Sequence, residues 1–190
     1  FTAEPTTTLP PCSTERHVVA FDYFGTVSVA DEELGAWLED TTNPPDARPG
    51  VAGVAAAYRA RGYELLYITT APEEIKVGET PIRDAITGWL TEQGFPLDAG
   101  TSLWVWDGNF TPMEGVTAEL DRLVGEGATI DAAYTDNEDK AFAFKTSVPS
   151  ERVFTLGTGA ATTGTTPIPG DDMTAHVATV EQLAPVCQSG

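Results

Sequence analysis

Short apolar runs recur along this chain and alternate with stretches in which apolar residues follow helical spacing. The runs are rich in Val, Ile, Leu, Phe and Tyr and are too short for buried helices, which favours strands. Strands are predicted at residues 17–22, 63–70, 103–106, 130–135 and 152–156. Helices are predicted over about 50–60, 81–93, 113–124, 141–146 and 180–183. Alternating elements of this length predict an α/β fold, a doubly wound parallel sheet of about five strands with helices on both faces.

The chain is predicted to fold as a single domain over residues 17–190, since 190 residues are enough for one full core. Residues 1–16 are rich in Thr and Pro and are expected to form an extended N-terminal stalk. Residues 28–49 contain a short acidic amphipathic stretch and an Asn-Pro-Pro-Asp cluster, which predicts a flap insertion rather than a large cap. Residues 157–177, rich in Gly, Thr and Pro, are predicted to be a loop.

Charge narrows the range of partners. The chain has 29 acidic and 10 basic residues, a net charge of -19. Such a field repels phosphate backbones and anionic lipid surfaces, so nucleic acid is excluded as an expected partner. No apolar run approaches the ~20 residues that span a bilayer. We therefore expect a soluble monomer without a membrane span.

Two cysteines, Cys12 and Cys187, lie near opposite ends of the chain. Domain termini are often close in space, which favours a disulfide between them; two unrelated buried thiols are the alternative. The chain also starts at Phe1 rather than Met, and its first residues are rich in Thr and Pro. Together these features predict a secreted or extracytoplasmic protein, although a chain cut from a longer one would also lack the Met.

Polar side chains stand where three of the predicted strands end. The carboxyl ends of parallel strands meet at one edge of a sheet, and ligands bind in the crevice there. We therefore expect one cleft that gathers Asp22 and Thr26, then Thr69 and Thr70, and finally Asp136 and Asp139.

The run Asp-Tyr-Phe-Gly-Thr at residues 22–26 resembles the first motif of the haloacid dehalogenase (HAD) superfamily, Asp-x-Asp-Gly-Thr. Asp22, Gly25 and Thr26 match, and Phe24 does not. Three further segments are similar to the lipin-type phosphatidate phosphatase branch and to the C-terminal domain of membrane-associated phosphatidylinositol transfer proteins. They are Arg-Pro-Gly-Val at 48–51 with the strand through 62–72, Trp-Leu-Thr-Glu-Gln-Gly-Phe-Pro at 89–96, and residues 132–155.

This resemblance implies a HAD-like Rossmannoid fold and a set of roles. An aspartate nucleophile attacks phosphorus, hydroxyl and ammonium donors hold the phosphoryl oxygens, and carboxylates hold Mg²⁺. The ligand it implies is a small phosphorylated molecule. Carried over to this chain, the catalytic residues are Asp22, Thr69 and Thr70, the substrate-binding residues Gly25, Thr26 and Lys140, and the metal ligands Asp22, Asp136 and Asp139.

Departures from the family pattern weaken the expected chemistry. Phe24 replaces the second aspartate, the general acid and base, whose loss costs about 100-fold to 10,000-fold in rate. Between residues 113 and 133 the one basic residue is Arg122, so the expected lysine is missing. Thr-Asp-Asn-Glu-Asp-Lys at 135–140 replaces Gly-Asn-x-x-Thr-Asp and puts Lys140 where an aspartate is expected.

Three functions stay open. The first is a HAD-like domain with weak or lost phosphatase activity that binds a small phosphorylated ligand. The second is an active Mg²⁺-dependent phosphomonoesterase in which Asp22 is the nucleophile and Asp136, Asp139 or Glu138 serves metal binding and proton transfer. The third is a metal-independent hydrolase of the dehalogenase type, because residues 22–26 are also similar to its Asp-x-Tyr-Gly-Thr motif.

Overall fold

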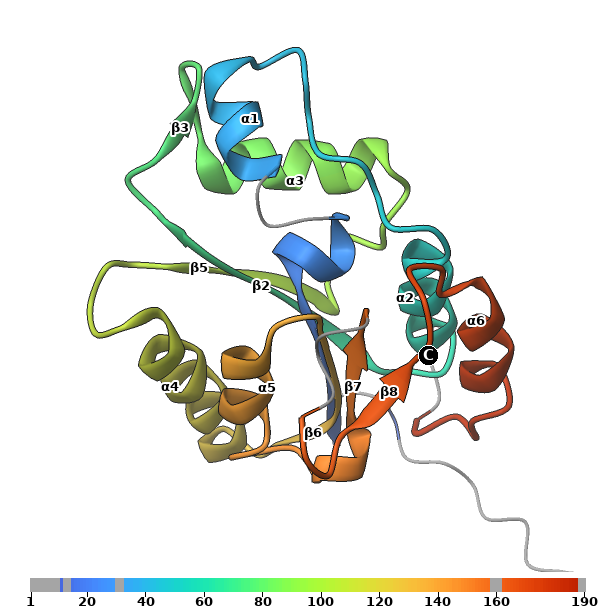
Figure 1. Ribbon diagram of the computed structural model, residues 1–190. Helices are drawn as coiled ribbons and strands as arrows, with labels where there is room; N and C mark the ends of the chain where they lie inside the picture. Colours follow the sequence, from blue (N-terminus) through green and yellow to red (C-terminus); the bar gives the residue numbers. More distant parts are fainter. Residues whose placement is uncertain (1–10, 12–14, 30–32, 158–161, 188–190) are drawn as a thin grey trace, which may run out of the picture.

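A six-stranded parallel sheet is the centre of the protein, in the order β5-β2-β1-β6-β7-β8. The structure is a computed structural model that describes residues 11, 15–29, 33–157 and 162–187 (Figure 1). This sheet confirms the predicted doubly wound α/β fold. The strands are β1 (Arg16–Asp22), β2 (Glu64–Pro72), β5 (Thr101–Trp106), β6 (Ala128–Thr135), β7 (Val153–Leu156) and β8 (Thr166–Ile168).

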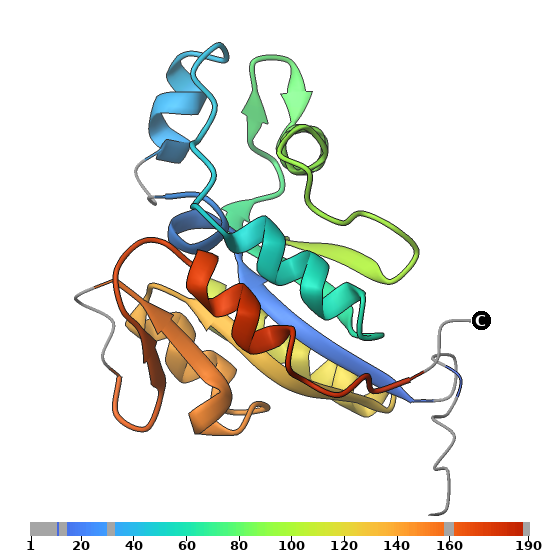
Figure 2. The ribbon, with the colours of Figure 1, turned by 90° about the vertical axis from the view of Figure 1, so that its right-hand side faces the viewer.

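Side chains of β1 alternate between two hydrophobic layers, as a strand buried on both faces requires. Val19 and Phe21 belong to the layer formed with α2 (Val51–Arg59), α3 (Ile82–Glu92) and α6 (Thr174–Val180). Val18 and Ala20 belong to the layer formed with α4 (Pro112–Gly125) and α5 (Glu138–Phe144). Figure 2 shows α2 and α6 side by side across one face of the sheet.

A smaller group of elements lies beyond the carboxyl end of β1, at the top of Figure 1. It consists of α1 (Glu33–Glu39), the hairpin of β3 (Lys76–Val77) and β4 (Thr80–Pro81), and α3. Trp37 of α1 is buried, and the indole of Trp89 donates a 2.8 Å hydrogen bond to the carbonyl of Pro45. The predicted flap is thus attached to the α3 side of the site.

The predicted loop over 157–177 is wrong in two places. The short strand β8 pairs with the outer edge of β7, and α6 occupies Thr174–Val180, so the helix predicted over 180–183 is also wrong. The edge of β7 offers unpaired backbone groups that Thr166–Ile168 fills, and an edge strand tolerates Pro167. Because this segment is rich in Gly, Thr and Pro and has no apolar run, its sequence did not predict the strand.

The predicted N-terminal stalk and disulfide lie mostly outside the described residues. Of residues 1–16, Pro11, Glu15 and Arg16 are described, and Arg16 already begins β1. Cys187 is buried, with its Sγ 3.3 Å from the carbonyl oxygen of Gly62, whereas Cys12 lies outside the described residues. The pairing of the two cysteines therefore stays a prediction. No helix in the described parts of the chain combines the length and hydrophobicity needed to cross a bilayer.

Candidate active site

Asp22, the last residue of β1, is fully buried and both of its carboxylate oxygens accept hydrogen bonds. Lys140 Nζ donates to Oδ1 over 2.7 Å, and Thr135 Oγ1 donates to Oδ2 over 3.0 Å. The Lys140 side chain is itself only 5% exposed. An ammonium and a hydroxyl at these distances stabilise a buried carboxylate in its charged form.

The start of α5 decides which side chain reaches Asp22. Strand β6 lies beside β1 and ends at Thr135, and Asn137 then caps α5 by accepting a 3.1 Å hydrogen bond from the backbone N–H of Lys140. Lys140 consequently turns inward, while Glu138 and Asp139 are exposed in the same first turn. The sequence predicted this helix from residue 141, three residues too late, and so did not predict this orientation.

Gly25 allows the carboxylate of Asp136 to lie against the turn that follows β1. The turn, η1 (Tyr23–Val27), has Gly25 at φ +80°, in the left-handed region. A Cβ at this position would lie 2.2 Å from Oδ2 of Asp136. The structure thus brings together Asp22, Gly25 and Asp136, three of the predicted site residues.

The three predicted hydroxyls have different surroundings. Thr69 is buried, and its Oγ1 accepts a 3.1 Å hydrogen bond from the backbone N–H of Ala71. Thr26 is also buried, and its hydroxyl has no hydrogen-bond partner among the described residues. Thr70 is half-buried and lines the pocket described next, so it is the hydroxyl placed to meet a ligand.

A pocket of about 320 Å³ opens at the carboxyl edge of the sheet. Its wall is mainly apolar and includes Phe24, and its polar groups come from β2 and the start of α5. The lining residues are Phe24, Leu34, Thr70, Ala71, Pro72, Pro112, Met113, Asn137, Asp139 and Lys140.

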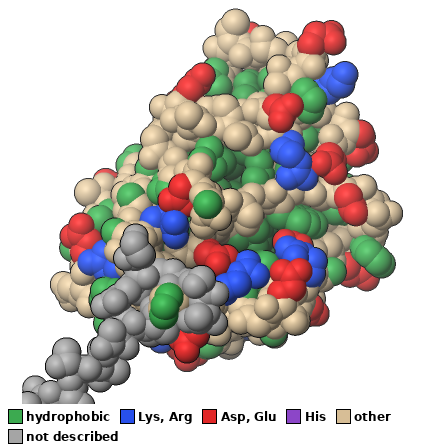
Figure 3. Space-filling model, turned by 180° about the vertical axis from the view of Figure 1, so that it is seen from behind, with side chains coloured by type: hydrophobic (Ala, Val, Ile, Leu, Met, Phe, Trp, Pro, Cys, Tyr) green, Lys and Arg blue, Asp and Glu red, His purple; other side chains and the backbone are tan. Residues whose placement is uncertain are grey.

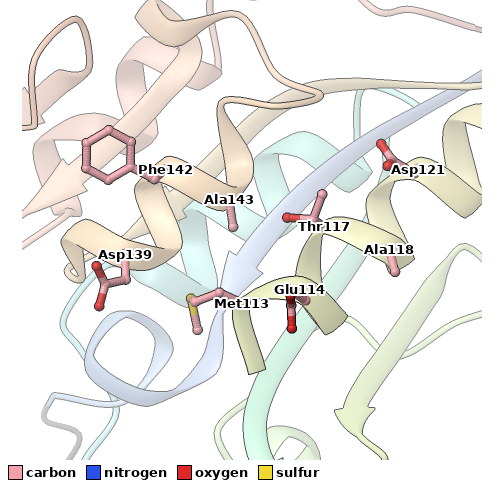
Figure 4. A pocket seen from close by; sticks show the side chains of 8 residues that line it. All are labelled: Met113, Glu114, Thr117, Ala118, Asp121, Asp139, Phe142 and Ala143. Carbon is pink, nitrogen blue, oxygen red and sulfur yellow. The ribbon is translucent and has the colours of Figure 1, made fainter. Parts of the chain in front are cut away.

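A second groove of about 520 Å³ runs between α4 and α5 and shares Met113 and Asp139 with the pocket. Figure 4 shows its lining, with Glu114 and Asp121 on α4 and Phe142 on α5. Phe142 is 54% exposed and carries the Lys145 ammonium 4.7 Å from its ring centroid. The groove is lined by residues of α4 and α5, and neither Asp22 nor its partners Lys140 and Thr135 line it.

The residues at the site do not fit a Mg²⁺ site. Mg²⁺ takes oxygen ligands in near-octahedral geometry, usually including one or two carboxylates. Of the predicted ligands, Asp22 is engaged by Lys140 and Thr135, Asp136 lies against Gly25, and Asp139 is exposed at the pocket wall. The described part of the chain contains no group of three or more His, Cys, Asp or Glu side chains arranged to hold a metal ion.

Arg48 is a site residue whose role the sequence did not indicate. The residue is 4% exposed, and its guanidinium donates to the carbonyls of Gly25, Thr26 and Val29, the last two over 3.2 and 2.9 Å. It also forms a 2.9 Å ion pair with Asp171, which precedes α6. Arg48 thereby fixes the turn after Asp22. The one signal was its place in the Arg-Pro-Gly-Val motif.

Fold and site together define a HAD-like phosphatase fold: a parallel sheet whose first strand ends on a buried aspartate, followed by a glycine turn. A putative HAD-like phosphatase from Mesorhizobium loti has the same fold, with a TM-score of 0.60 and 14% identity over 96% of this chain and 91% of that one. The D,D-heptose 1,7-bisphosphate phosphatase of B. bronchiseptica, solved with magnesium and phosphate, also has a TM-score of 0.60 and 14% identity, over 87% of this chain and 98% of that one.

Within this superfamily, the family described as the LNS2 domain of PITM 1-3 matches residues 26–157, and the chain belongs to it. Protein retinal degeneration B of Drosophila melanogaster is 27% identical over 129 residues, which are 67% of this chain and 10% of that protein. The chain thus spans about a tenth of this relative's length. Both the HAD superfamily and the lipin-type branch predicted from the sequence are confirmed.

Proposed function

We propose that this LNS2 domain keeps the HAD fold but has lost phosphatase turnover. The observation that carries the proposal is the pair of hydrogen bonds that hold Asp22: Lys140 on one carboxylate oxygen and Thr135 on the other. Each donor draws electron density from the carboxylate oxygen that accepts it, and so lowers the nucleophilicity of that oxygen toward phosphorus. Asp22 is also fully buried, whereas a nucleophile must meet substrate in the pocket.

Phe24 supports the same proposal. Its ring lines the pocket and packs edge-on against Tyr23, with 4.6 Å between centroids. A phenyl group cannot give a proton to a leaving alkoxide or take one from water. Loss of a general acid and base lowers rates by about 100-fold to 10,000-fold.

The pocket itself supports binding of a small phosphorylated ligand. Thr70 offers a hydroxyl, and Lys140, whose ammonium donates to Asp22 Oδ1, also lines the pocket. Phe24 and Met113 offer apolar contact for the rest of such a molecule. The nearby carboxylate of Asp139 opposes the charge of a phosphate, so we propose weak, millimolar binding.

Hydrolysis assays test the loss of turnover. Wild type and Asp22→Asn are assayed on p-nitrophenyl phosphate, with Mg²⁺ and with chelator, and on 2-chloropropionate for halide release. We expect the two proteins to give the same background on every substrate. Mg²⁺-dependent hydrolysis that Asp22→Asn lacks would establish the phosphomonoesterase instead, and metal-free halide release that Asp22→Asn lacks would establish the dehalogenase-type hydrolase.

Calorimetry tests the ligand. Inorganic phosphate and glycerol phosphate are titrated into wild type, Thr70→Val and the exposed control Thr42→Val, which lies in the flap outside the pocket. We expect Thr70→Val to weaken binding by about threefold to tenfold, the loss of one hydrogen bond. Equal affinities in the three proteins, or no saturable heat in wild type, would contradict the binding role.

An extracytoplasmic location is also proposed, supported by the two cysteines. Its test is the redox state of those cysteines.

A further inference from the structure

We infer that the Lys140 ammonium is a built-in cation that takes the place of a divalent metal at Asp22. The site therefore does not bind divalent metals, and it would bind them if this ammonium were removed. The inference concerns the same pocket as the proposed function but holds whether or not the pocket turns over a substrate. It starts from the poor fit of the residues to Mg²⁺.

The ammonium lies too close to Asp22 for a metal to bind the same oxygen. Lys140 Nζ lies 2.7 Å from Asp22 Oδ1, the oxygen that a metal would otherwise bind at about 2 Å. A divalent ion on that oxygen would stand within a few ångströms of a positive charge. Two cations so close in a buried site repel strongly, because water does not screen them there. The other oxygen, Oδ2, is held by Thr135.

Lys140 is fixed at this position by the helix that carries it. Lys140 belongs to the first turn of α5, which Asn137 caps through its side chain and through its backbone carbonyl, the latter accepting from Ala141 N–H over 2.9 Å. The side chain is almost fully buried. Unlike a bound ion, this cation cannot exchange with solvent, and its charge is present at every metal concentration.

Other carboxylates lie near Asp22 and Lys140. Asp136 lies against Gly25 in the turn directly after Asp22, and Asp139 lines the same pocket as Lys140. A carboxylate at position 140 would therefore join Asp22 and Asp136 at the end of β1. Carboxylates together with water are the oxygen ligands that Mg²⁺ and Mn²⁺ take.

The test is direct metal binding to the whole chain. Mn²⁺ alone is titrated into wild type, Lys140→Asp and Lys145→Asp, and free Mn²⁺ is followed by electron paramagnetic resonance. Lys145→Asp is the matched control: it makes the same charge change on the residue directly after α5, where Lys145 contacts the Thr163 carbonyl and Phe142 rather than Asp22.

We expect no saturable binding below about 1 mM Mn²⁺ in wild type and Lys145→Asp, and binding at least ten times tighter in Lys140→Asp. Asp22→Asn in the Lys140→Asp background should abolish that gain. Saturable binding by wild type that Asp22→Asn removes would overturn the inference, as would equal affinities of Lys140→Asp and Lys145→Asp.

A second variant covers the case in which Lys140→Asp does not fold. Lys140→Met removes the charge and keeps the length of the side chain, so it should bind Mn²⁺ more tightly than wild type does. No difference between these two proteins, once circular dichroism shows both to be folded, would overturn the inference. Phosphatase turnover by wild type without metal would defeat the proposed function and leave this inference standing, whereas Mn²⁺ binding at Asp22 in wild type would do the opposite.

Discussion

Asp22, Arg48 and Lys140 are the charged side chains that the described structure buries. A buried charge costs several kcal/mol unless it is paired, and all three residues have charged partners. In the case of Asp22 and Lys140 the partners are each other. The position of Asp22 was predictable, because an apolar run that ends on a carboxylate indicates a strand end. Its partner was not, since the inward turn of Lys140 depends on where α5 begins.

Breaking this ion pair from one side should destabilise the fold strongly. Asp22→Asn leaves a buried ammonium without its carboxylate, and Lys140→Met leaves the carboxylate without its ammonium. We expect each single variant to lose about 3–5 kcal/mol in free energy of unfolding, measured by urea denaturation. The double variant Asp22→Asn with Lys140→Met removes both charges and should recover most of that loss.

The surface pair of Arg59 and Asp98 is the control for this cycle. Its 2.8 Å distance is similar, but the Asp98 side chain is 56% exposed. Asp98→Asn should change stability by at most about 1 kcal/mol. Additive losses in the Asp22 and Lys140 double variant would show that the two groups do not interact as the structure indicates.

Among the elements, the turn η1 depends on an arginine from the segment before α2. The Arg48 guanidinium supplies donors to three carbonyls of residues 25–29, a stretch whose buried groups need partners. It also links this turn to the residues before α6 through Asp171. One side chain thus joins the site to two elements that lie far apart in the sequence.

Arg48→Met should separate the role of these hydrogen bonds from that of the surface ion pair. It leaves three carbonyls without donors, and we expect a loss of at least about 3 kcal/mol in free energy of unfolding. Asp171→Asn removes only the exposed partner, whose side chain is 79% exposed, and should cost at most about 1 kcal/mol. Equal losses in the two variants, measured by urea denaturation, would contradict this division.

Elements with a clear apolar pattern were predicted well, and elements held by backbone pairing or by a cap were not. The strands that became β1, β2, β5, β6 and β7 were all predicted, because each contains a run of apolar and aromatic residues, and in β1 and β2 burial on both faces makes that run continuous. Strand β8 and the start of α6 lie in a Gly- and Thr-rich segment with no such run. The start of α5 was missed because Asn137 was read as part of a loop, although Asn is a strong N-cap.

A polar chain links α2, β6 and α6 on the face opposite α4. The hydroxyls of Tyr58 and Tyr134 are 2.9 Å apart, and the Tyr134 hydroxyl is 2.8 Å from Nε2 of His176. Burial raises the pKa of Tyr58 to about 12 and that of Tyr134 well above its usual 10, so both hydroxyls stay protonated. Burial also lowers the pKa of His176 from its usual 6.5.

The lowered pKa of His176 predicts a loss of stability in mild acid. Below pH 6.5 the unfolded chain takes up a proton at His176 that the folded chain resists, so the free energy of unfolding falls as pH falls through this range. His176→Gln does not titrate and should lose less stability between pH 7.5 and pH 5.5. Urea midpoints at the two pH values measure the effect. An equal change of midpoint in wild type and His176→Gln would contradict it.

For the whole molecule, the net charge of -19 leaves little positive potential on the surface. Seven of the ten basic residues lie within salt-bridge distance of a carboxylate of the described residues, and on the face in Figure 3 basic groups lie beside acidic ones. A phosphorylated ligand would therefore receive no long-range attraction. Any affinity must come from short-range contacts with groups such as Thr70 and Lys140.

The predicted disulfide between Cys12 and Cys187 would enclose nearly the whole chain. By the chain-entropy model such a long loop stabilises the fold by up to about 5 kcal/mol, since it restricts the unfolded chain most. We expect reductant, or Cys187→Ser, to lower the urea midpoint, and reductant to have no further effect on Cys187→Ser. Without reductant, neither cysteine of the denatured wild type should react with iodoacetamide. Alkylation of both cysteines would instead indicate two free thiols. The proposal of an extracytoplasmic protein would then lose its support, because an oxidising compartment is what maintains such a bond.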